Sequence, residues 1–221
     1  FFFFFERVKG FDKGMASGLL LIYFIGGLLG APLWTWLSYR VGKHRALAIS
    51  GVVYAALTMA SLAIPVGNFP SAALLMCLIG VPYAAGAFLL RAMMADIGDE
   101  ERLESGVDRT GLLYALLAGT VKIGAAAAVG VTFPLLQALG FDPTSEGVDS
   151  GLAGLALLFA AIPAGMSLLA SWIVLGFPLT AERHAEIRAA LAKRDLADAA
   201  PEMSADPLIS EEIHVAARPA E

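Results

Sequence analysis

Five long apolar segments, separated by short polar connections, make up most of this chain of 221 residues. Each segment is long enough to cross the roughly 30 Å hydrocarbon layer of a bilayer as a helix, and none shows the period of two that is typical of a strand. Only helices and closed barrels satisfy their backbone groups in lipid. The pattern therefore predicts an all-α, polytopic membrane helix bundle over residues 1–178, with spans at about 15–39, 46–65, 71–94, 110–139 and 151–177.

The two ends of the chain depart from this pattern. Phe1 to Phe5 are interpreted as the cut end of a further span, so that the chain is expected to be part of something larger. Residues 179–196 are predicted to form a cytoplasmic amphipathic helix, which the Thr180 hydroxyl can cap. Residues 197–221 contain prolines and many acidic residues, and we expect a disordered acidic tail there.

Basic residues fall in alternate connections, which predicts the orientation. They cluster in the connections near 40–45 and 91–109 and after residue 177, and the positive-inside rule places these segments in the cytoplasm. Three basic residues near the start, Arg7, Lys9 and Lys13, would then lie outside, against the rule. The expected location is the plasma membrane, the inner membrane of a bacterium, with the carboxyl-terminal tail in the cytoplasm.

Composition excludes several classes of function. The chain is 58% hydrophobic and only 16% charged, and its acidic residues gather in one connection and in the tail rather than on a nucleic-acid-binding face. Its single cysteine, Cys77, excludes an internal disulfide, and its three histidines lie outside the spans without metal-ligand spacing. The spans also lack a nucleophile with a base. We therefore expect neither an enzyme nor a resident cofactor or metal.

One lysine, Lys122, lies about midway along the apolar segment 110–139. An ammonium at that depth costs about 2.5–3.5 kcal/mol unless it faces a cavity or a partner. At 100° per residue, its helix face carries almost only small side chains: Ala115, Ala118, Gly119, Ala125, Ala126 and, two turns on, Val129. No Asp or Glu lies in the five apolar cores. The partner is expected to be an acidic residue of a missing half, a substrate anion or water in a shared cavity; a lysine that snorkels to the interface is the structural alternative.

Two segments, PLWTWLSYRVGKHRAL and ADIGDEERLESGVDRTGLLYALLAGTVKIG, are similar to a known family. The chain resembles the carboxyl-terminal half of the glycoside-pentoside-hexuronide cation symporters, the melibiose-permease-like branch of the major facilitator superfamily. The resemblance implies cation-coupled symport of a small solute by alternating access. It also implies that the solute is held between two halves and that the coupling cation, sodium or proton, binds mainly in the amino-terminal half.

The resemblance also indicates which residues to examine. The expected solute and coupling pathway contains Lys122, Tyr114, Ala118 and Gly119, and the expected cytoplasmic gating loops contain Arg40, Gly42, Lys43, Arg45, Asp96, Asp99 and Arg109. Glycoside-transporting members tend to have polar side chains where this chain has Leu117 and Ala118, and an aromatic residue where it has Ala87. A sugar or glycoside is the expected solute, with a lysolipid as an alternative. A non-transporting membrane scaffold or receptor is the alternative from another class.

Overall fold

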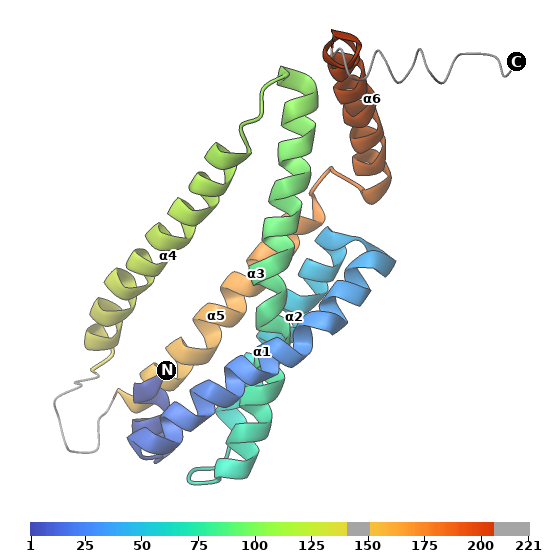
Figure 1. Cartoon of the computed structure of the whole chain (residues 1–221). Helices are drawn as coiled ribbons and strands as arrows, with labels where there is room; N and C mark the ends of the chain where they lie inside the picture. The colour runs from blue at the N-terminus through green and yellow to red at the C-terminus, as the bar shows by residue number, and fades with distance from the viewer. Residues whose placement is uncertain (141–150, 206–221) are drawn as a thin grey trace, which may run out of the picture. The chain divides into compact units, whose positions relative to one another are not determined.

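A computed structural model describes residues 1–140 and 151–205, with side chains as far as residue 198. Every regular element in that part of the chain is a helix (Figure 1). Five of them, α1 to α5, are long and apolar enough to cross a membrane. The elements are η1 (Phe4–Val8), α1 (Lys13–Val41), α2 (Lys43–Ala60), η2 (Ser61–Ala63), α3 (Phe69–Ser105), α4 (Thr110–Ala138), α5 (Leu152–Leu175) and α6 (Ala181–Ala205).

Each predicted span coincides with one of the helices α1 to α5, which confirms the all-α membrane bundle. The expectation that Asp96 and Asp99 lie in a loop is wrong, because α3 continues as a helix to Ser105. The hydrophobic pattern stops near Met94, but helix formation does not depend on hydrophobicity, and the Glu-, Arg- and Leu-containing stretch that follows carries good helix formers.

Helix α6 likewise runs beyond its predicted end. It contains the predicted helix from residue 181 and continues to Ala205, so the first residues of the expected disordered tail are helical. Alanine and glutamate favour a helix even where no apolar face is available. The rest of that predicted tail, 206–221, and nearly all of the predicted outer connection 140–150 lie outside the described residues.

The chain divides into two compact units. The first consists of Phe1–Met94 and Leu112–Pro178 and contains the apolar helices, and the second consists of Ala95–Gly111 and Leu179–Glu221. Helix α3 thus contributes its apolar part to the first unit and its acidic last turns to the second.

Helices α1 and α3 of the first unit pack backbone against backbone. A Cβ atom on Gly30 of α1 would lie 2.7 Å from the carbonyl oxygen of Val81, and one on Gly26 would collide with the backbone of Cys77. The indole Nε1 of Trp34 donates a hydrogen bond of 2.8 Å to the same Val81 carbonyl. The glycines of span 15–39 therefore serve the close helix packing that a small-xxx-small pattern predicts.

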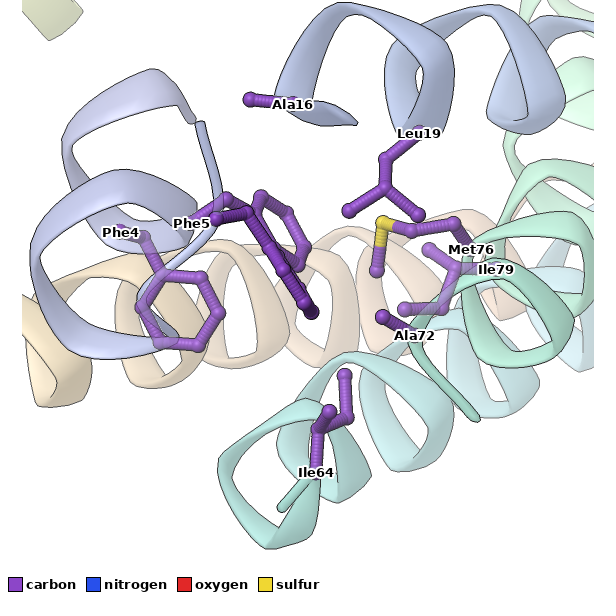
Figure 2. Packing of buried hydrophobic residues seen from close by; sticks show 9 residues of the cluster. Phe4, Phe5, Ala16, Leu19, Ile64, Ala72, Met76 and Ile79 are labelled. Atoms are coloured by element: carbon purple, nitrogen blue, oxygen red, sulfur yellow. The ribbon is translucent and has the colours of Figure 1, made fainter. Parts of the chain in front are cut away.

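Phenylalanines from the start of the chain fill one end of the first unit. Phe4 and Phe5 are fully buried, and the Phe4 ring stacks on Phe159 of α5 with centroids 4.1 Å apart. Figure 2 shows Phe4 and Phe5 beside buried side chains from α1, α3 and the segment that joins α2 to α3, including Leu19, Ile64 and Met76. This core fixes η1 against the spanning helices.

Lys9, one of the three basic residues that run against the positive-inside rule, is buried. Only 4% of its surface is exposed, and its Nζ donates hydrogen bonds to the carbonyl oxygens of Leu62 (3.0 Å) and Ile64 (2.7 Å). The ammonium also lies 5.4 Å from the centroid of the Phe4 ring. These carbonyls end the helical stretch α2–η2, where the helix dipole favours a cation. Lys9 thus packs within the first unit and is not a free surface charge.

Candidate functional site

The middle of helix α4, which carries Lys122, is not packed by the part of the chain that the structure describes. Lys122 and every other residue from 121 to 131 is exposed. Cβ atoms added at Gly119, Gly124 and Gly130 would meet no atom within 4 Å. Within residues 1–140 and 151–198, Lys122 forms no ion pair or hydrogen bond. Its ammonium is therefore open to a partner that comes from elsewhere.

The face around Lys122 is open as well. Ala118, one turn before the lysine, is exposed and Gly119 is half-buried. Leu117 is also half-buried. A solute group as large as a carboxylate or phosphate could therefore approach the ammonium without displacing a bulky side chain.

Tyr114 joins the beginning of α4 to α3. Its hydroxyl donates a hydrogen bond of 2.9 Å to the carbonyl oxygen of Arg91, whose guanidinium in turn donates to the carbonyl of Ala87 one turn earlier. At the other end of α4, Leu136 packs against Leu155 of α5. Helix α4 is therefore held to α3 near its beginning and to α5 near its end, while the stretch around Lys122 stays open.

The first expected gating segment is a turn of a single residue. Gly42 separates α1 from α2, and its φ of 91° and ψ of 152° are a conformation that side chains with a Cβ rarely adopt. The guanidinium of Arg40 lies over the Trp36 ring, 5.3 Å from its centroid, and Arg45 is exposed. Lys43, which begins α2, is half-buried. The structure brings these four residues together, and their role in gating stays a prediction.

The second expected gating segment forms a polar network within the second unit. Nε2 of His184 in α6 lies 2.9 Å from Oδ2 of Asp99 and 3.4 Å from Oδ1 of Asp96. Arg109 pairs with Glu101 at 3.2 Å. These contacts join α6 to the acidic last turns of α3, and His184 was not among the site residues predicted from the sequence.

Two more contacts extend this network along α6. The guanidinium of Arg102 pairs with Asp195 at 2.9 Å, and Arg194 donates to the main-chain carbonyl of Arg102 at 3.1 Å. Both partners of the Arg102–Asp195 pair are more than a third exposed, so the pair contributes little stability on its own. The contact between His184 and Asp99 is less exposed to solvent than the Arg102–Asp195 pair.

Three tyrosines of the first unit, which sequence reasoning missed, lie together, two of them half-buried and Tyr83 exposed. Tyr23, Tyr54 and Tyr83 come from α1, α2 and α3, and the ring centroids of Tyr23 and Tyr83 are 5.0 Å apart. They are separated by about thirty residues in the chain and belong to no motif. Among the described residues, no group of three potential metal-ligating side chains lies together.

Comparison with known sequences decides the family. The family described as MFS/sugar transport protein matches residues 1–181. The chain belongs to this family.

As a member of the MFS/sugar transport family with five spanning helices, the chain is an integral membrane protein. This confirms the resemblance that the two sequence segments indicated. Proteins of this family are transporters rather than enzymes.

Two curated relatives match at low identity. The glucuronide carrier protein homolog of Escherichia coli (strain K12) is 24% identical over 177 residues, which are 80% of this chain and 39% of the relative. The sphingosine-1-phosphate transporter MFSD2B of Mus musculus is 26% identical over 168 residues, 73% of this chain and 33% of the relative. The chain thus spans well under half the length of either relative. No solved structure gives a significant match.

Proposed function

We propose that this chain forms one half of a secondary transporter that moves a small organic anion of the glycoside class by cation-coupled symport and alternating access. The observation that carries the proposal is Lys122, a cation midway along a spanning helix, exposed on an Ala- and Gly-lined face without a partner in the described residues. Ionisable residues at such a depth line transport paths or cavities far more often than they face lipid.

The names of the two relatives support an anionic solute. A glucuronide carries a carboxylate and sphingosine-1-phosphate carries a phosphate, so the two named solutes share a negatively charged group. An ammonium on a flexible stem binds either group as a compact point charge. Lys122 would pair with this group. The free-energy cost of placing the lysine's charge within the membrane would then fall when the solute is bound.

A lysolipid phosphate is the second candidate solute. Leu117 and Ala118 offer no hydrogen-bonding side chain beside Lys122, which fits an apolar chain better than a sugar hydroxyl. The similarity to the sphingosine-1-phosphate transporter favours the same candidate. Both candidates need the anion contact with Lys122, and they differ in what the rest of the site must recognise.

The coupling cation, sodium or proton, is proposed to bind mainly in an amino-terminal half that is not part of this chain. A cation site needs oxygen ligands, usually carboxylates, and the apolar cores of the five spans hold no Asp or Glu. The placement of Lys and Arg supports a cytoplasmic position for the α1–α2 turn and for α6, in a plasma membrane such as the bacterial inner membrane. Reporter fusions at residue 43 and after residue 205 test this orientation.

Uptake into vesicles that contain the complete transporter tests the function. The probes are a labelled glucuronide, a neutral glycoside of the same size and sphingosine-1-phosphate, each with an imposed sodium or proton gradient. We expect concentrative uptake of an anionic probe with one of the gradients. Lys122→Gln should abolish that uptake with normal membrane insertion, while Lys122→Arg, which keeps the charge, should retain part of it.

Two results would overturn the proposal. Undiminished gradient-driven uptake by Lys122→Gln would remove the lysine from the pathway. Absence of any gradient-driven uptake, together with a phenotype that depends only on residues 197–221, would favour a scaffold that binds a partner through its tail.

A further inference from the structure

The tyrosine cluster, defined as Tyr23, Tyr54 and Tyr83, is an aromatic and polar group within the spanning helices. The Tyr83 ring lies 5.0 Å from that of Tyr23 and 6.3 Å from that of Tyr54, with interplanar angles of 46° and 38°. The three residues come from three helices of the first unit. All three lie within the apolar segments that form the spans.

The cluster holds several hydroxyl groups in an otherwise apolar region. The hydroxyls of Tyr23 and Tyr54 are within hydrogen-bonding reach of each other. Thr58 lies one turn beyond Tyr54 and is only 4% exposed, and its Oγ1 lies near the Tyr54 hydroxyl without full hydrogen-bond geometry. Each hydroxyl both donates and accepts hydrogen bonds, so the group can bind a further polar partner beside its internal contacts.

Tyr83 is exposed midway along a span, where contact with lipid is unfavourable for its hydroxyl. It lies midway along the apolar part of α3, residues 71–94, and 52% of its surface is exposed. Tyrosines that face lipid gather at the membrane interface, where the hydroxyl reaches water. At mid-span the hydroxyl would face hydrocarbon without a hydrogen bond, which costs free energy. The exposed face of Tyr83 is therefore expected to meet water or a polar ligand.

We propose that the tyrosine cluster contacts a carbohydrate ring of the transported solute. The Tyr83 ring stacks on the apolar C–H face of the sugar, and the hydroxyls of Tyr23 and Tyr54 form hydrogen bonds with hydroxyls at the sugar's edge. Small-molecule sites in proteins combine aromatic walls with a few placed polar groups, which is the composition found here. The inference rests on the proposed transport function and deepens it, since it selects the glycoside over the lysolipid.

The hydroxyls of the cluster distinguish between these two solutes. An acyl chain has no hydrogen-bonding groups, so binding it here would leave the phenol hydroxyls and Thr58 without new partners. A sugar ring offers an apolar face and a polar edge at once. A cluster of hydroxyls therefore favours binding of a glycoside and disfavours binding of a lipid tail.

Equilibrium binding of p-nitrophenyl glucuronide to the purified complete transporter in nanodiscs tests the proposal, with uptake of the same compound as a second readout. Tyr54→Phe removes one hydroxyl and keeps the ring. We expect it to weaken binding and raise KM about tenfold, the effect of one hydrogen bond, with little change in maximal rate. Tyr83→Leu should weaken binding at least as much, and Tyr83→Phe, which keeps the stacking ring, should lose less.

Tyr39→Phe is the matched control, because Tyr39 is 85% exposed near the end of α1 and belongs to no cluster. It should leave binding and uptake unchanged. Unchanged binding in both Tyr54→Phe and Tyr83→Leu, with Lys122→Gln still inactive, overturns the tyrosine site and leaves the proposed transport function standing. Binding of sphingosine-1-phosphate but not of the glucuronide by the unaltered protein also overturns it. Circular dichroism and gel filtration show whether each variant is folded.

Discussion

Nε2 of His184 lies 2.9 Å from Oδ2 of Asp99 and joins α6 to the last turns of α3. The contact is half-buried and spans 85 residues of the chain, and Asp96 lies on the same nitrogen at 3.4 Å. Because the carboxylates of Asp99 and Asp96 both lie near this nitrogen, replacing either aspartate alone leaves His184 with one carboxylate partner. The histidine is therefore the residue on which the docking of α6 depends most.

His184→Ala is expected to loosen α6. The loss of a half-buried hydrogen bond to a carboxylate should lower the free energy of docking by about 1–2 kcal/mol. Hydrogen–deuterium exchange of the α6 backbone amides should speed up accordingly. Arg188→Ala, in the same helix at an exposed position, is the control. Equal exchange rates in both variants would show that His184 does not hold the helix.

Gly30→Ala is expected to destabilise the first unit. Its new methyl group would lie 2.7 Å from the Val81 carbonyl, and overpacking of this kind costs about 1–3 kcal/mol. Thermal unfolding in detergent measures the effect. Gly165→Ala in α5, where an added Cβ would meet no atom within 4 Å, should instead leave the melting temperature unchanged or raise it.

Gly42→Ala is expected to strain the α1–α2 turn. The φ of 91° with ψ of 152° belongs to a region that is almost confined to glycine, and forcing another residue into it costs about 1–3 kcal/mol. Because one residue forms the whole connection, neighbouring residues cannot absorb the change. A melting temperature equal to that of the unaltered protein would contradict this account.

Lys9→Met is expected to weaken the attachment of η1. It removes two hydrogen bonds to main-chain carbonyls and leaves these buried acceptors unpaired, for a loss of about 2–3 kcal/mol. Thermal unfolding again gives the measurement. Lys13→Met, which removes an exposed charge nearby, should change the melting temperature far less.

The same lysine predicts a pH dependence. Burial lowers the pKa of Lys9 from its ordinary value of 10.5. Between the lowered pKa and 10.5 the unfolded state binds more protons than the folded state, so the contribution of Lys9 to stability rises with pH in that window. The difference in melting temperature between the unaltered protein and Lys9→Met should therefore widen as the pH is raised towards 10.5. A difference that narrows would contradict the lowered pKa of Lys9.

The spans could be predicted from the sequence because lipid allows few solutions. A run of some twenty apolar residues must become a helix, and α1 to α5 coincide with the five predicted segments. The end of α3 at Ser105 could not be predicted from hydropathy. Beyond Met94 the helix leaves the apolar pattern, so hydropathy no longer reports on its conformation.

The candidate site was predictable only where one residue type stood out against its surroundings. Lys122 was visible because a charge in an apolar segment is costly. The tyrosine cluster was not, because each tyrosine alone is an ordinary residue of a span and only the packing of three helices brings them together. His184 was missed for the same reason, since its partner Asp99 lies 85 residues away along the chain.

The backbone contact between α1 and α3 at Gly26 and Gly30 has a practical consequence for measuring motion. Two helices whose main chains lie this close have little room to shift against each other, so we expect α1 and α3 to move together at this contact. A pair of spin labels, one on each helix, would keep a fixed separation whatever the solute or cation present. The distance between these two labels serves as an internal reference for measuring the displacement of other helices.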